Sequence, residues 1–179
     1  VSGLVDQVEV YAGTHALKVA EIAVTLGRSL QLPTPTLVAL QLAACLHDCG
    51  EVNLPRDLLK AGRALTGDEW FLLRTHPILG ELALRERLPA AEDVPSYVRW
   101  HHENWDGNGY PDRLRGEEIP LPARILALAD AVTAMCADRP YRAALPLSQI
   151  EAEVRKQAGI RFDPRVVAAW LQLHHAPPR

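Results

Sequence analysis

The 179-residue sequence has few cysteines, no block of basic residues and no long apolar run. Its three cysteines are an odd number without a regular framework, which indicates a reducing compartment and a cytoplasmic protein. A net charge of −3 argues against duplex nucleic acid or an anionic membrane surface as the main partner. No apolar stretch is long enough to span a bilayer, so we expect no membrane contact from this segment, and no signal peptide is visible.

The composition that remains is that of an ordinary globular domain. Apolar residues make up 48% of the sequence and charged residues 23%, and 179 residues are enough for a proper core. We therefore expect residues 1–179 to form one domain. The sequence begins at Val1 rather than Met, which leaves room for an upstream segment, including one that tethers the domain to the inner face of a membrane.

Apolar residues recur at spacings of three and four along nearly the whole chain, which predicts helices rather than strands. The segment 36–47 is apolar on all sides and is expected to be a central helix. Thr66 with Glu69, and Ser148 with Glu151, have the spacing of helix-capping motifs. We predict an all-α fold, a compact single-domain bundle of about seven helices, with helices near 6–30, 36–47, 66–76, 78–88, 95–102, 123–136, from 148, and 164–174.

The segment 100–111 contains two adjacent histidines, His101 and His102, followed by a glycine-rich loop that stops at Pro111. Adjacent residues on a helix point about 100° apart, so paired histidines pack poorly in a core. They can, however, reach two neighbouring metal ions from one backbone segment. Imidazole suits first-row transition metals, and two carboxylates elsewhere in the chain can complete such a site.

Two aspartates occur where an isolated charge is costly. Asp48 follows His47 at the end of the apolar segment, and Asp130 lies in the middle of a second apolar helix. Metal ligation explains both positions. The alternatives are that Asp48 caps the next turn, and that Asp130 forms a buried ion pair with Arg124 or Arg139.

Two more histidines are candidate ligands. His15 falls on the apolar side of the first helix, where a hydrogen-bonded core histidine is the alternative, and His76 falls at the joint between two helices. Cys49 is expected to be a small buried residue, with thiolate ligation as the alternative. His174 and His175 lie near the end of the chain and are expected to be exposed.

These candidates belong to a longer series of motifs that resembles the HD-GYP family of the HD phosphohydrolase superfamily over nearly the whole chain. The matching motifs are His47-Asp48-Cys49-Gly50, Asn53-Leu54-Pro55, Leu65-Thr66 with Glu69-Trp70, His76-Pro77 with Gly80, His101-His102-Glu103, Trp105-Asp106-Gly107, Gly109-Tyr110-Pro111, Gly116-Glu117-Glu118-Ile119-Pro120, Arg124-Ile125, Asp130-Ala131, Asp138-Arg139-Pro140-Tyr141-Arg142 and Phe162-Asp163-Pro164.

The resemblance implies an all-α bundle with a di- or trinuclear metal site that hydrolyses cyclic di-GMP to linear pGpG or GMP as the output domain of a signalling protein. It implies that the divalent metals are iron or manganese, with zinc, nickel or magnesium as alternatives. Asp48 would bridge the metals, Arg139 and Arg142 would contact the substrate, and Tyr110 would lie beside the site in a loop that can contact a protein partner. The implied metal ligands are His15, His47, Asp48, His76, His101, His102 and Asp130.

The residue types fit this chemistry without the family name. Two cations about 3.5–4 Å apart can generate a bridging hydroxide near neutral pH and clamp phosphoryl oxygens. Arginine suits bidentate contact with phosphate, although Arg139 has a structural pair with Asp138 as its alternative. Gly107 and Gly109 allow a tight loop to approach a ligand, and an ordinary turn is the alternative.

The sequence departs from the family pattern at three positions. Glu51 replaces the usual Lys, which would repel a phosphate unless Glu51 binds a metal or acts as a catalytic acid or base, with a solvated loop carboxylate as the alternative. Tyr11 replaces the Glu of trinuclear members, and Glu9 is poorly aimed, so we predict two metals. Thr133 replaces an Asp expected to contact a guanine base, which leaves substrate identity open.

Three functions therefore compete. The first is a metal-dependent cyclic di-GMP phosphodiesterase, with Asp48 and Glu51 as catalytic residues and Arg139, Arg142, Tyr110 and Thr133 in substrate binding. The second is a cyclic dinucleotide receptor whose turnover Glu51 and Thr133 have impaired. The third is an HD phosphohydrolase acting on another nucleotide. The complete ligand set favours catalysis, because unused metal ligands in a core would be costly.

Overall fold

The computed structural model describes residues 12–59, 61, 63–138 and 143–175, and these residues form an all-helical bundle. No strand occurs among them beyond one isolated bridge between Ala158 and Phe162. The elements are α2 (Ala12–Ser29), α3 (Thr34–Leu46), η1 (Cys49–Asn53), α4 (Arg56–Leu59), α5 (Gly67–Leu73), α6 (His76–Arg87), α7 (Val94–Arg99), η2 (Gly116–Glu118), α8 (Leu121–Cys136), α9 (Leu147–Lys156) and α10 (Pro164–His175).

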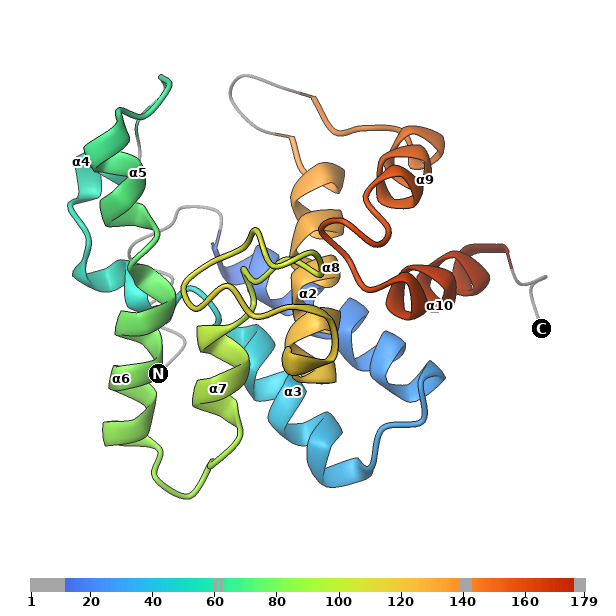
Figure 1. The fold of residues 1–179 in the computed structure, drawn as a ribbon, viewed down its shortest axis with the longest axis horizontal. Coiled ribbons are helices and arrows are strands. Elements are labelled where there is room, and N and C mark those ends of the chain that lie inside the picture. Colours follow the sequence, from blue (N-terminus) through green and yellow to red (C-terminus); the bar gives the residue numbers. More distant parts are fainter. Residues whose placement is uncertain (1–11, 60, 62, 139–142, 176–179) are drawn as a thin grey trace.

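The centre of the bundle is α8, which buries ten of its residues because nearly every face is apolar. It packs against α2, α3, α7, α9 and α10, while α6 packs against α7 and η1. Figure 1 shows α6 and α7 side by side on one side of α8, and α9 and α10 on the other. The predicted all-α class is confirmed. The helical segments that were not predicted are short, such as the four-residue α4.

Local signals set most helix boundaries as predicted. Thr66 and Glu69 form a reciprocal capping box at the start of α5, because the Thr66 hydroxyl accepts from the Glu69 amide and the Glu69 carboxylate accepts from the Thr66 amide. Asp163 accepts a hydrogen bond from the Arg165 amide at the start of α10. The capping motif predicted at Ser148 is wrong, because α9 already begins at Leu147 behind Pro146, without a side-chain cap.

The paired histidines lie elsewhere than predicted. Helix α7 ends at Arg99, so His101 and His102 occupy the turn that follows the helix rather than the helix itself. Leaving the helix releases the two rings from the 100° helical spacing, and their centroids lie only 3.9 Å apart. Among the described helices, none is both long and apolar enough to cross a bilayer.

Candidate metal centre

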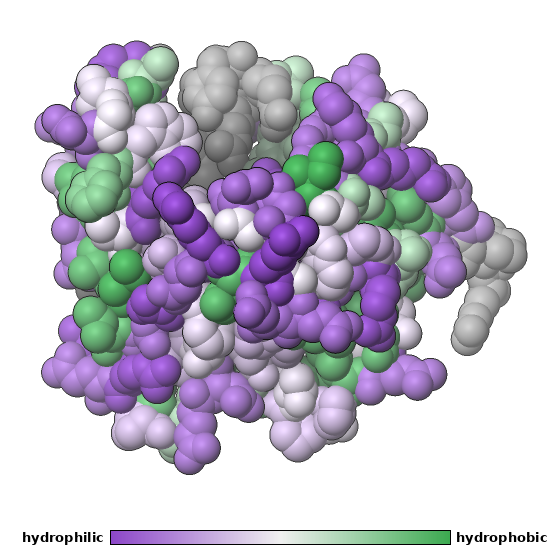
Figure 2. All heavy atoms as spheres, in the orientation of Figure 1, coloured by the Kyte–Doolittle hydropathy of each residue, from purple (hydrophilic) through white to green (hydrophobic). Residues whose placement is uncertain are grey.

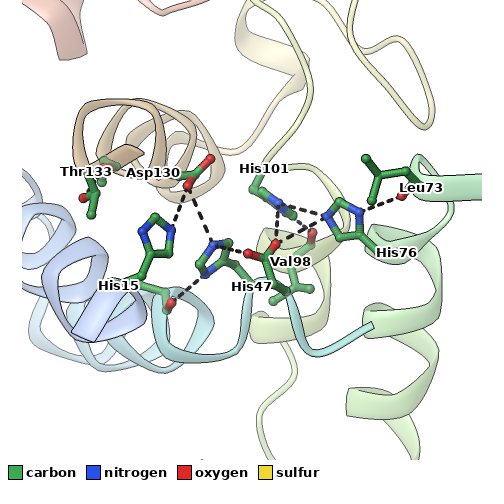
Figure 3. Close-up of polar contacts among 11 residues, drawn as sticks. His15, His47, Leu73, His76, Val98, His101, Asp130 and Thr133 are labelled. Carbon is green, nitrogen blue, oxygen red and sulfur yellow. Dashed lines mark hydrogen bonds and ion pairs between the residues drawn. The ribbon is translucent and has the colours of Figure 1, made fainter. Parts of the chain in front are cut away.

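All seven predicted metal ligands converge on one place. They come from the start of α2, the end of α3, the first residue of α6, the turn after α7 and the middle of α8. Figure 3 shows the rings of His15, His47, His101 and His76 in a row between these elements, with Asp130 above the first two. The donor atoms form two groups, and within each group all of them lie within 4.8 Å of one another. One group is Asp48 with His76, His101 and His102, and the other is Asp48 with His15 and His47.

Asp48 belongs to both groups, and its two oxygens face different histidines. Oδ2 lies 2.9 Å from His47 Nε2, whereas Oδ1 lies 3.5 Å from His76 Nε2 and 3.8 Å from His101 Nε2. A carboxylate placed between two clusters of imidazole nitrogens has the position of a bridging ligand. The alternative of Asp48 as a helix cap does not hold, because no side-chain cap bond forms at η1.

Three of the histidines are oriented by the same device. The Nδ1 atoms of His47, His76 and His101 lie 2.7–2.9 Å from the carbonyl oxygen three residues earlier in the chain, in Ala44, Leu73 and Val98. A carbonyl can only accept, so each Nδ1 donates, and the other ring nitrogen, Nε2, is left facing Asp48. Metal-binding histidines characteristically donate their second nitrogen to such a carbonyl, which fixes ring orientation and tautomer.

His47 shows that the cluster requires a positive charge. Its buried Nε2 lies between the Asp48 and Asp130 carboxylates but has no hydrogen-bond partner of good geometry. Burial by itself would lower the pKa of His47, but the two carboxylates raise that pKa to about 10. Without a metal, a proton on His47 therefore offsets one of the two carboxylate charges. A divalent cation between these atoms would offset both, so the donor set fits a metal.

His101, His102 and Asp48 have the protonation states that ligands need. Burial, together with His47 and His76, lowers the pKa of His101 to about 4, so its ring is neutral at pH 7. Burial and its histidine neighbours also hold the pKa of His102 well below its usual value. Burial opposes ionisation of Asp48, yet His47 beside it keeps the pKa of this carboxyl well below normal.

Among the described residues, the partners of Asp130 are histidines. Its Oδ1 lies 3.2 Å from His15 Nε2 and 3.9 Å from His47 Nε2. Arg124, one of the two arginines considered as its partner, lies 2.6 Å from the buried Asp163 instead. Arg139, the other, lies outside the described residues.

The cluster opens to solvent on its carboxylate side. The side chains of His47, His76 and His101 are at most 3% exposed, whereas Asp48 is 24%, His15 19% and Asp130 18% exposed. A ligand that approaches from solvent therefore meets the Asp48–His15–Asp130 side first, and the buried histidines form the floor.

This geometry agrees with the comparisons to known proteins. The sequence matches the family model described as "HD domain" over residues 2–166, which is most of the chain. This chain belongs to the HD domain family. The expectation from the motifs is thus confirmed for the family.

Two curated relatives and one solved structure show how far the similarity extends. A Vibrio cholerae protein named "Probable cyclic di-GMP phosphodiesterase" is 37% identical over 88% of this chain and 38% of its own length. The V. cholerae "3'3'-cGAMP-specific phosphodiesterase 2" is 33% identical over 89% of this chain and 31% of its own length. The crystal structure of V-cGAP3 from V. cholerae has a TM-score of 0.72 at 23% identity and covers 91% of this chain and 44% of that chain. The chain thus spans less than half of each.

The turn after the histidine pair of this HD domain is held by Glu103, which the sequence analysis did not single out for a role. Its buried carboxylate accepts hydrogen bonds from the Asp112 and Arg113 amides at 2.6 and 3.0 Å. Arg99 and Trp100 in turn donate to the Asp112 side chain. These bonds close the loop on the end of α7 and so fix the backbone that carries His101 and His102.

Tyr110 lies at the edge of the cluster, as predicted. Its ring stacks on His102, with centroids 4.8 Å apart and an interplanar angle of 29°. Burial and then the Asp48 carboxylate raise the pKa of the Tyr110 phenol, so the side chain is neutral. In this position Tyr110 covers a metal-ligand candidate and faces the site.

The remaining predicted site residues are placed as follows. Glu51 lies in η1 three residues after Asp48 and is half-buried. Thr133 lies one turn after Asp130 on α8, but it is buried and its hydroxyl donates to the Ala129 carbonyl at 2.8 Å. To donate to a substrate, that hydroxyl would have to leave its present acceptor. Arg139 and Arg142 lie outside the described residues, as do Tyr11 and Glu9.

Cys49 is not part of either donor group. Its thiol faces the Gly80 carbonyl of α6 at 3.9 Å, and burial followed by the Asp48 charge raises its pKa to about 11. A thiol that stays protonated and points at a backbone carbonyl is a packing residue. The structure therefore favours the core role for Cys49 over thiolate ligation.

Proposed function

We propose that this HD domain is a metal-dependent phosphodiesterase that hydrolyses cyclic di-GMP to linear pGpG, GMP or both. The observation that carries the proposal is the position of Asp48, whose two oxygens face separate histidine groups. Such an arrangement suits a pair of cations, and paired cations are a recurrent means of phosphodiester hydrolysis. The name of the 37% identical relative supports the same substrate.

Each residue has a role in the proposed site. His15, His47 and Asp130 would hold one metal and His76, His101 and His102 the other, with Asp48 shared by both. When bound, the metal pair would lower the pKa of water and neutralise charge on the phosphoryl group. The carbonyls of Ala44, Leu73 and Val98 would keep three imidazoles aimed at the metals. A donor set of imidazole and carboxylate favours iron or manganese, with zinc, nickel or magnesium as alternatives.

A different cyclic dinucleotide is the second candidate substrate. A relative named as specific for 3'3'-cGAMP is 33% identical to this chain, only slightly less than the first relative. Thr133 stands where the related family often has an aspartate for a guanine base, so base selection is open at that position. Both candidates require the same metal centre.

Turnover by metal-loaded protein tests the proposal. Protein purified without oxygen is analysed for metals, loaded with iron or manganese, and given cyclic di-GMP, 3'3'-cGAMP, pGpG or bis(p-nitrophenyl) phosphate. We expect hydrolysis of cyclic di-GMP that a chelator abolishes and metal restores. Product from 3'3'-cGAMP alone would favour the second substrate, and tight binding without product would establish a receptor instead.

Glu51 provides a more specific test. If repulsion between the Glu51 carboxylate and a phosphate limits turnover, Glu51→Lys should raise kcat/KM for cyclic di-GMP by about tenfold. The measurement is steady-state kinetics alongside elemental analysis of the same protein. A variant that loses metal would instead show that Glu51 is a ligand, and a variant that keeps its metal but loses turnover would identify Glu51 as the catalytic acid or base.

The setting of the reaction belongs to the same proposal. Three free cysteines suit the reducing cytoplasm, where the substrate would be met. The loop of Gly109, Tyr110 and Pro111 would be available to a protein partner at the rim of the site.

A further inference from the structure

A column of stacked side chains leads from the surface to the metal-ligand candidates. It begins with Trp70 on α5, which is 47% exposed. The Arg74 guanidinium carbon lies over the Trp70 ring, 5.8 Å from its centroid, and over the Tyr110 ring, 5.3 Å from its centroid. Tyr110 stacks on His102, which belongs to one of the two donor groups. Arg74 is thus a cation next to the site, held between two aromatic rings.

Arg74 differs from the structural arginines of this domain. Arg63, Arg85, Arg99 and Arg124 each form an ion pair with a carboxylate at 2.5–2.9 Å. Arg74 is exposed and directly follows the last residue of α5, and among the described residues its guanidinium donates to no carboxylate or carbonyl. Its charge is therefore held in place without being neutralised, which is the condition for binding an anion from solvent.

We propose that Arg74 binds a phosphate of the substrate outside the metal cluster. The inference rests on the proposed function, because a cyclic dinucleotide carries two phosphodiesters and only one can react at the metals at a time. A guanidinium has five donors in a planar fork that matches two phosphate oxygens. The Trp70 and Tyr110 rings already restrict the Arg74 side chain before a ligand binds. Binding therefore costs less conformational entropy than it would for a freely moving arginine.

The surroundings favour an anionic ligand over an apolar protein partner. Trp70, Phe71 and Leu72 of α5 are all exposed, and Figure 2 shows hydrophobic residues on the side of the molecule where α5 and α6 lie. None of the residues that the structure describes buries these three side chains. The unneutralised charge of Arg74, in contrast, lies beside a cluster that itself would receive a phosphate. A second exposed cation, Arg161, lies on the segment whose carbonyls accept from the Trp105 and Asp106 amides in the loop that leads to Tyr110.

The test compares Arg74→Gln and Arg74→Lys with Arg155→Gln, which removes an exposed arginine from α9. Binding of cyclic di-GMP to protein from which a chelator has removed the metal is measured by equilibrium dialysis at two salt concentrations. Manganese-loaded protein gives kcat and KM for cyclic di-GMP and for bis(p-nitrophenyl) phosphate, which has one phosphate. Elemental analysis and thermal unfolding are recorded for every variant.

We expect Arg74→Gln to weaken binding and raise KM for cyclic di-GMP by about tenfold, with a smaller salt dependence of binding. Its kcat, its metal content and its activity on bis(p-nitrophenyl) phosphate should stay within about twofold of the wild type. Arg74→Lys should recover part of the affinity, because it keeps the charge but not the fork. Arg155→Gln should match the wild type.

Three results from the variants would overturn the inference. They are unchanged affinity in Arg74→Gln, an equal loss in Arg155→Gln, and loss of metal or of folding in Arg74→Gln, which would make Arg74 a structural clamp on Tyr110. Failure of the wild-type protein to bind cyclic di-GMP would overturn it as well. Binding that depends on Arg74 without any turnover would leave the inference standing and overturn only the proposed phosphodiesterase activity.

Discussion

Asp48→Asn is expected to remove both metals and to lower hydrolysis of cyclic di-GMP by about a thousandfold or more. Metal ions contribute several kcal/mol to stabilising a phosphoryl transition state, which corresponds to that change in rate. Asparagine keeps the shape of the side chain but loses the negative charge that faces His47, His76 and His101. Because one carboxylate belongs to both donor groups, a single substitution affects both.

Elemental analysis and steady-state kinetics of manganese-loaded protein measure this effect. Asp57→Asn is the matched control, since it removes an exposed carboxylate from α4 with the same change of charge. It should retain full metal content and activity. Two metals per chain in the Asp48→Asn protein would contradict the assignment of Asp48 as the shared ligand.

Gly50→Ala is expected to lower the free energy of unfolding by about 3 kcal/mol or more, and to remove metal from the site. A Cβ atom at Gly50 would lie 2.0 Å from the His76 carbonyl oxygen and 2.6 Å from the Gly80 amide nitrogen. Both are backbone atoms of α6, so neither can rotate away, and α6 would have to move off η1. Since Asp48 precedes η1 and His76 begins α6, that movement would separate two ligands.

Gly67→Ala is the matched control because it adds the same methyl group to another glycine of the same region. A Cβ atom there meets nothing within 4 Å, and Gly67 begins α5. We expect unchanged activity and a gain in stability of up to about 1 kcal/mol, since alanine favours the helix. Denaturant unfolding and elemental analysis of both variants separate the two outcomes. Full metal content in the Gly50→Ala protein would show that the η1–α6 contact does not position the site.

Several features of this protein were predictable from the sequence because they are encoded locally. Helical periodicity predicted an all-α fold, and the spacing of Thr66 and Glu69 predicted a capping box that forms as expected. A carboxylate at the end of an apolar helix and another in the middle of one pointed to the ligand set, since isolated charges are costly in a core. Helical periodicity and the capping box depend on residues a few positions apart, and the cost of an isolated charge follows from the apolar residues that flank it in the chain.

Other features were decided by tertiary packing. The sequence allowed Arg124 as a partner for Asp130, but the approach of α10 to α8 gives Arg124 to Asp163. The motif allowed His101 and His102 to continue a helix, but α7 ends before them. The two histidines lie instead in a turn, which Glu103 closes by accepting hydrogen bonds from the amides of residues 112 and 113.

The sharing of Asp48 and the placement of Arg74 over Tyr110 depend on the same kind of long-range contact. Each joins side chains from segments far apart in the sequence, whose distances follow only once α6, α7 and α8 pack together. Residue spacing fixes which face of a helix a side chain occupies. The sequence by itself thus determined which residues this HD domain has available as ligands, and only the packing of its helices determined which of them meet.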